Sequence, residues 1–117
     1  MSAVKVKKVK PYPIVAQLAG PSGAGPGQIL KLVMKGFIVD MQSKVLKVGD
    51  IYQVTFELPV LRVVIDQFAK VMKTYDRVNS GSQAIERLAE FHFTALSDEQ
   101  TKKIYSFLTA IHQDDIS

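Results

Sequence analysis

The sequence contains no cysteine among its 117 residues. Disulfides, thiol catalysis and cysteine-ligated zinc are therefore excluded. It also lacks long hydrophobic runs: the longest, near residues 58–65, is interrupted by Arg62, whereas a membrane helix needs about 18 consecutive apolar residues. No apolar segment of about 7 to 15 residues follows the basic N-terminus, as a secretory signal would require. We expect a cytoplasmic protein without membrane insertion.

Positive charge is concentrated at one end of the chain. The formal net charge is +4, and 47% of the residues are hydrophobic, which fits one ordinary folded domain. Four lysines fall within six positions, namely Lys5, Lys7, Lys8 and Lys10. We expect residues 1–10 to form a basic arm that the fold does not need, and residues 11–113 to form a single domain.

Apolar residues recur at every second position in the first half of the chain, which predicts strands with one buried face. The residues expected on buried faces are Tyr12, Ile14, Ala16, Leu18, Leu30, Leu32, Met34, Phe37, Val39, Met41, Tyr52, Val54, Phe56 and Leu58. Glycines and prolines over residues 20–27 predict a surface loop, and residues 47–50 predict a turn. The parity changes at Gly36, which indicates a bulge or a tight bend there.

A long strand is expected after Pro59, a residue that cannot donate to a strand ladder. Its expected buried face consists of Leu61, Val63, Ile65, Ala69, Val71 and Tyr75. Phe68 and Met72 interrupt the otherwise polar series on its other face. Residues 79–82 predict a turn and residues 88–93 the last strand.

The period then changes to that of a helix. Ser97 and Gln100 have the spacing of a capping box, in which each side chain satisfies a free backbone donor of the first turn. One apolar stripe follows, made of Ile104, Phe107, Leu108 and Ile111. The pattern predicts an all-β fold with a C-terminal helix, and closure into a small barrel would remove exposed strand edges.

Short motifs follow one another in a characteristic order: a glycine after the second strand, LKVGD at residues 46–50, FELP at residues 56–59 and FHFTALS at residues 91–97. Their order resembles that of the PilZ domain family over about residues 12–111. The resemblance implies a six-stranded antiparallel β-barrel with a C-terminal α-helix. It also implies a role in bacterial signalling, because typical members bind cyclic di-GMP.

The two motifs with which the family binds that nucleotide are missing. The first is Arg-x-x-x-Arg ahead of the first strand, but the first arginine of this chain is Arg62. The second is Asp or Asn-x-Ser-x-x-Gly. If Gly36 is the family glycine, Lys31 replaces the acceptor and Val33 replaces the serine. The resemblance therefore implies a degenerate member that does not bind cyclic di-GMP in isolation.

Any residual nucleotide site would have to be built mainly from lysines. The candidate residues are Lys5, Lys7, Lys8, Lys10, Lys31, Lys35 and Gly36. We expect no catalytic residues, no metal ligands and no cofactor, because no spacing of His, Asp and Glu matches a metal or catalytic site. The protein is accordingly not expected to be an enzyme.

The leading hypothesis for function is a signalling adaptor that works through contact with a protein partner. The first alternative is a cyclic di-GMP receptor with a non-standard, lysine-based site. The second alternative is a small nucleic-acid-binding barrel, supported only by the basic arm. Nucleic acid is the less expected ligand because the arm has no aromatic residues on which bases could stack.

Overall fold

The computed structural model of the chain describes residues 11–21, 23–41, 46–78, 81 and 85–116, with side chains described through residue 111. The basic arm at residues 1–10 and most of the turn expected at residues 79–82 lie outside the described residues. The elements in chain order are β1 (Ile14–Gly20), β2 (Gly23–Val33), β3 (Gly36–Asp40), β4 (Ile51–Leu58), β5 (Val63–Val78), β6 (Ile85–Phe93) and α1 (Asp98–Ile116).

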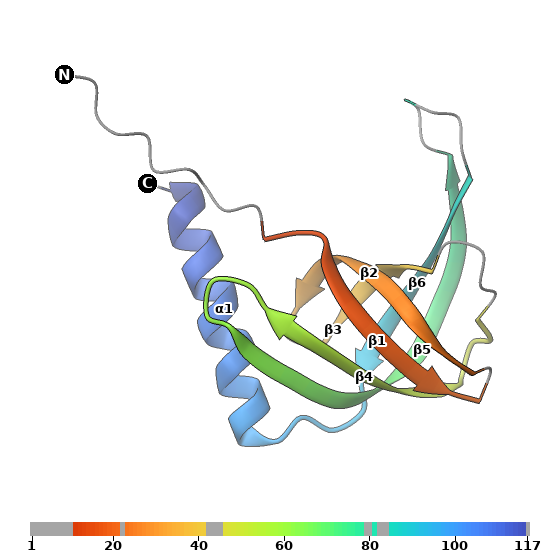
Figure 1. Ribbon diagram of the computed structural model, residues 1–117, viewed down its shortest axis with the longest axis horizontal. Helices are drawn as coiled ribbons and strands as arrows, with labels where there is room; N and C mark the ends of the chain where they lie inside the picture. Colours follow the sequence, from red (N-terminus) through yellow and green to blue (C-terminus); the bar gives the residue numbers. More distant parts are fainter. Residues whose placement is uncertain (1–10, 22, 42–45, 79–80, 82–84, 117) are drawn as a thin grey trace.

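The six strands form a closed antiparallel barrel in the order β1-β2-β3-β6-β5-β4, which β4 closes by pairing with β1. The helix α1 stands at the end of the barrel where β2 and β4 finish, and the β5–β6 hairpin projects from the opposite side (Figure 1). The predicted fold class is therefore confirmed. Among the described residues, no helix has the length and apolar character needed to cross a membrane.

Alternating side chains fill the barrel, as predicted for strands with one wet face. The expected buried residues that are in fact buried on β1, β3 and β4 are Ile14, Ala16, Leu18, Phe37, Val39, Tyr52, Val54, Phe56 and Leu58. The rings of Phe37 and Phe91 stack with centroids 5.0 Å apart in the middle of this core. The turn at residues 47–50 is also confirmed, since the Asp50 amide donates to the Lys47 carbonyl at 3.2 Å.

The surface loop expected at residues 20–27 is wrong for most of that segment. Strand β2 begins at Gly23, and residues 23–29 pair with β1 in an unbroken register. A Cβ added to Gly27 would lie 2.8 Å from Val39 Cγ2, so this glycine lets the strand approach the core rather than making a turn. Pairing with β1 therefore overrides the loop preference of the composition.

The irregularity expected at Gly36 divides into two features. The tight bend is confirmed, because Val33 pairs with Gly36 across the turn of Met34 and Lys35. The register shift lies earlier, between Ile29 and Lys31. The alternation had predicted that Leu30 is buried. Because of the register shift, Leu30 is only half-buried, and Ile29 is buried in the core in its place.

The last two strands are bounded differently from the prediction. Strand β5 begins at Val63 rather than Leu61, and β6 begins at Ile85, three residues earlier than expected. A second register shift lies between Val71 and Lys73. Tyr75 consequently pairs with Leu88 outside the main core cluster instead of continuing the face of Ile65, Ala69 and Val71.

The start of α1 forms half of the predicted capping box. The Gln100 amide donates to Ser97 Oγ at 3.2 Å, as expected. The Gln100 side chain does not return to Ser97. Its Oε1 instead accepts from the Asp66 amide at 3.4 Å, which ties the first turn of the helix to β5.

Replacing Ser97 with alanine removes the acceptor of this cap. We expect Ser97→Ala to lower the free energy of unfolding by about 0.5 to 2 kcal/mol, as for other caps. Denaturant melts would measure the loss, with Ser106→Ala, on the exposed side of the same helix, as a control close to neutral. A neutral Ser97→Ala variant would contradict the cap.

The helix docks through its predicted apolar stripe. Ile104 and Phe107 are buried, and Leu108 and Ile111 pack partly buried against the same core. The Tyr12 ring meets the Phe107 ring edge to face at 6.5 Å, and the Tyr12 hydroxyl accepts from the Leu32 amide at 3.1 Å. Burial raises the pKa of Tyr12, so the neutral phenol that joins helix and barrel is favoured.

Candidate functional site

A hollow of about 230 Å³ lies on the outer face of β2, β3 and β6. Cross-strand pairing explains its position. Val33, Gly36 and His92 form one row across the three strands, and Lys31, Ile38 and Glu90 form the next row. Residues of both rows line the hollow, with Gly36 in the middle of the first.

Three of the predicted site residues meet in this hollow. Lys31 extends from β2, Lys35 from the turn after it, and Gly36 begins β3. The other predicted candidates, Lys5, Lys7, Lys8 and Lys10, lie outside the described residues. Lys31, Lys35 and Gly36 are thus brought together, and their role in binding stays a prediction.

Two side chains that sequence reasoning did not assign to the site line the same hollow. His92 Nε2 lies 2.9 Å from Glu90 Oε2, and both residues are partly exposed. They come from β6, more than fifty positions from Lys31 in the sequence, so only the pairing of β3 with β6 brings them there. The hollow therefore combines two lysines with one carboxylate and its imidazole partner.

Packing against β6 requires a glycine at position 36. A Cβ on this residue would lie 1.8 Å from the carbonyl oxygen of Phe91 and 2.9 Å from His92 Cα. These are backbone atoms of the neighbouring strand, which cannot rotate away as a side chain can. The glycine is thus explained by the close approach of β3 and β6 whether or not a ligand binds.

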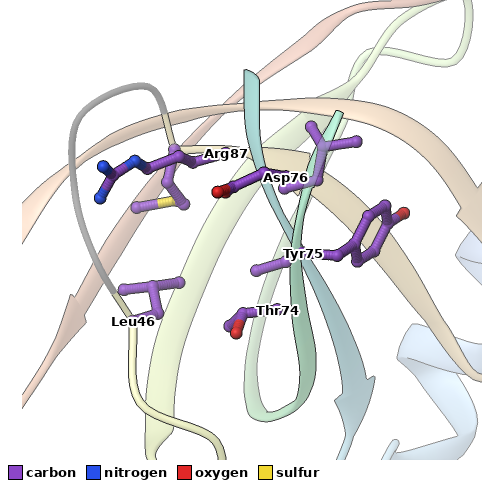
Figure 2. A pocket seen from close by; sticks show the side chains of 8 residues that line it. Leu46, Thr74, Tyr75, Asp76 and Arg87 are labelled. Carbon is purple, nitrogen blue, oxygen red and sulfur yellow. The ribbon is translucent and has the colours of Figure 1, made fainter. Parts of the chain in front are cut away.

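A larger hollow of about 300 Å³ lies beside the β5–β6 hairpin (Figure 2). Thr74 and Asp76 come from β5, Arg87 from β6, and Leu46 from the segment before β4. Asp76 and Arg87 are directly paired positions on the two strands. This hollow has a single guanidinium among its lining residues, whereas a nucleotide with two phosphates would be gripped by a cluster of arginines.

Neither hollow holds the constellation of a reaction centre. Among the described residues, no group of three or more His, Asp and Glu side chains could hold a metal ion. Two ion pairs lie on the surface outside these hollows, Arg77 with Glu86 at 2.6 Å and Lys103 with Glu99 at 3.4 Å. The smaller hollow, with its two lysines, is the better candidate for binding an anionic group.

Comparison with known proteins extends the sequence resemblance to three dimensions. No protein-family model matches the chain, and no curated protein sequence matches it. Solved structures do match. The PilZ domain with c-di-GMP of YcgR from Escherichia coli superposes with a TM-score of 0.74 and 12% identity, over 88% of this chain and 84% of that one.

Two longer proteins match as well. K. pneumonia MrkH in its apo state gives a TM-score of 0.77 with 9% identity over 98% of this chain. The Bacillus subtilis inhibitor of motility (MotI/DgrA) gives 0.69 with 12% identity over 93% of it. The chain spans about half the length of each, 54% and 52%. The barrel order, the terminal helix and these superpositions agree that the chain has the fold of a PilZ domain.

Proposed function

We propose that the chain is a cytoplasmic, non-enzymatic signalling module of the PilZ type that acts through contact with a protein partner and does not bind cyclic di-GMP on its own. The observation that carries the proposal is the chemistry of the hollow on β2, β3 and β6. Lys31 offers hydrogen-bond donors where the family pattern has an acceptor, and Val33 offers none. A guanine edge placed there would lose its partners.

The loss of these two hydrogen bonds to guanine can be converted into a loss of affinity for cyclic di-GMP. Hydrogen bonds to charged groups contribute about 1.5 to 3 kcal/mol each, and each 1.4 kcal/mol is a factor of ten. The missing serine hydroxyl would make a neutral bond of about 0.5 to 1.5 kcal/mol, so the two missing contacts together weaken binding by at least roughly thirtyfold. The Glu90 carboxylate adds repulsion toward a phosphate at the same place, since it lines the hollow beside His92.

A second candidate function is a cyclic di-GMP receptor with a lysine-based site. The observation in its favour is that Lys31 and Lys35 line one hollow, where both ammonium groups can attract a phosphate. Lysine supplies charge but not the planar fork with which arginine grips a phosphate or stacks on a guanine. We therefore rank this candidate below the adaptor.

Isothermal titration calorimetry with cyclic di-GMP at near-physiological salt tests the proposal. We expect no saturable binding tighter than about 10 μM, because the hollow lacks the polar partners of the base. Saturable binding below that value, abolished in Lys31→Ala and retained in the control Lys102→Ala on the exposed side of α1, would establish the receptor instead.

A further inference from the structure

The outer face of β4 and β5 carries several exposed apolar side chains. Ile51, Phe68 and Met72 have 48%, 53% and 43% of their surface exposed. Ile51 pairs with Lys70, the residue midway between Phe68 and Met72, so the three apolar side chains flank that lysine on three sides, and His92 of β6 pairs with it on the fourth. Val48 is exposed as well, and the next residue, Gly49, donates its amide to the Val71 carbonyl of β5 at 2.8 Å.

Nothing in the packing of the domain accounts for this surface. The apolar stripe of α1 is already used against Tyr12 and the barrel core. The contact of α1 with β5 lies at Asp66, where the carboxylate accepts from Gln53 and Thr55 and the amide donates to Gln100. Clustered apolar side chains on a protein surface commonly mark an interaction site.

The shape of the surface favours a helix as the occupant. Lys70 is paired on both sides, with Ile51 of β4 and His92 of β6, so at this position the face presents side chains and not an open strand edge. Phe68 and Met72 are four residues apart, or about 13 Å along a strand. Apolar residues at i, i+3, i+4, i+7, i+8 and i+11 of a helix span about 16 Å at a rise of about 1.5 Å per residue, which covers that distance.

Charge indicates which kind of helix fits. Within the described parts of the chain, neither Lys70 nor Lys47 has an acidic partner, whereas Asp66 at the border is already hydrogen-bonded. A second copy docked by two-fold symmetry would bring Lys70 against its own equivalent. Lipid recognition uses clusters of about four to eight basic residues, more than this face presents.

We infer that the face formed by Ile51, Phe68 and Met72 docks an amphipathic helix of a partner protein, with apolar residues toward Phe68 and acidic residues beside Lys70. This inference rests on the proposed function, since it specifies the protein contact that the adaptor would make. It also gives a role to the two residues, Phe68 and Met72, that interrupt the polar face in the sequence.

A synthetic peptide tests the inference on the full chain. The probe is an amphipathic helix of about 18 residues with leucines on one face and glutamates at its borders. Fluorescence anisotropy should show saturable binding, weakened about tenfold or more in Phe68→Asp, as for a central apolar contact. Phe68→Thr, which keeps a strand-forming residue, should also weaken it. Val15→Asp, at a position 59% exposed on β1, is the matched control and should bind normally.

Charge reversal tests the acidic preference. The same peptide with lysines in place of glutamates should bind the wild type at least about tenfold more weakly, and Lys70→Glu should reverse the order. Equal binding of both peptides would overturn the acidic partner. In ¹⁵N-labelled protein, the peptide should change the amide chemical shifts of Ile51, Phe68 and Met72. Changes confined to other residues would overturn the proposed position of the docking face.

The same variants also distinguish a partner helix from a second copy of the chain and from a membrane surface. A concentration-dependent dimer in sedimentation, abolished in Phe68→Asp, would replace the partner helix with a second copy. Binding to phosphatidylserine vesicles, abolished in that variant, would replace it with a membrane. If the peptide does not bind and calorimetry also shows no cyclic di-GMP binding, the docking face is wrong and the proposed function stands. Tight cyclic di-GMP binding would overturn the proposed function whatever the peptide does.

Discussion

Replacing Phe107 with alanine should lower the free energy of unfolding by about 3 to 5 kcal/mol, the range found for buried aromatic residues. Phe107 is fully buried and is the largest apolar side chain that α1 places in the core. Its ring packs edge to face on Tyr12, so the substitution removes both area and an aromatic pair. The loss is also expected to loosen the end of the barrel that α1 covers.

Equilibrium denaturation in urea measures this effect. The matched control is Tyr105→Ala on the same helix, where the side chain is 64% exposed and a change within about 0.5 kcal/mol is expected. A loss below about 1 kcal/mol for Phe107→Ala would mean that α1 is not docked in this way.

Gly36→Ala should be at least as damaging, by about 3 kcal/mol or more, because it overpacks a site that cannot relax. The added methyl would lie 1.8 Å from the Phe91 carbonyl oxygen, so β3 and β6 would have to separate. That pairing is continued by the Phe93 amide, which donates to the Lys35 carbonyl at 2.9 Å. The strand ladder and the hollow would be disturbed together.

Thermal and urea melts compare this variant with Lys35→Ala, which changes an exposed turn residue and should be within about 0.5 kcal/mol of wild type. A Gly36→Ala protein as stable as that control would show that the strands can part easily. The glycine would then have to be explained by ligand binding and not by packing.

The buried faces of β1 and β4 were predictable from the sequence because antiparallel strands with one wet face have a period of two. Ala16 and Leu18 on β1, and Val54 and Phe56 on β4, followed that rule. The start of β2 was not predictable. Gly27 reads locally as a loop residue, and only its position against Val39 and Leu18 explains why a glycine is needed in a strand.

The candidate site was predictable only in its local part. Lys31, Lys35 and Gly36 lie within six positions, so a hairpin brings them together. Glu90 and His92 join them through the pairing of β3 with β6, which no local pattern specifies. Phe68 and Met72 were visible as irregularities, but only the pairing of Ile51 with Lys70 shows that they form one surface.

The central claim is that the hollow on β2, β3 and β6 does not accept cyclic di-GMP. An NMR titration of ¹⁵N-labelled protein tests it most directly, since nucleotide up to about 1 mM would reveal even weak binding at individual residues. We expect the amides of Gly36 and His92 to show no saturating shifts, because Lys31 and Val33 cannot pair with a guanine edge. Saturating shifts at those two amides, lost in Lys31→Ala, would contradict the claim.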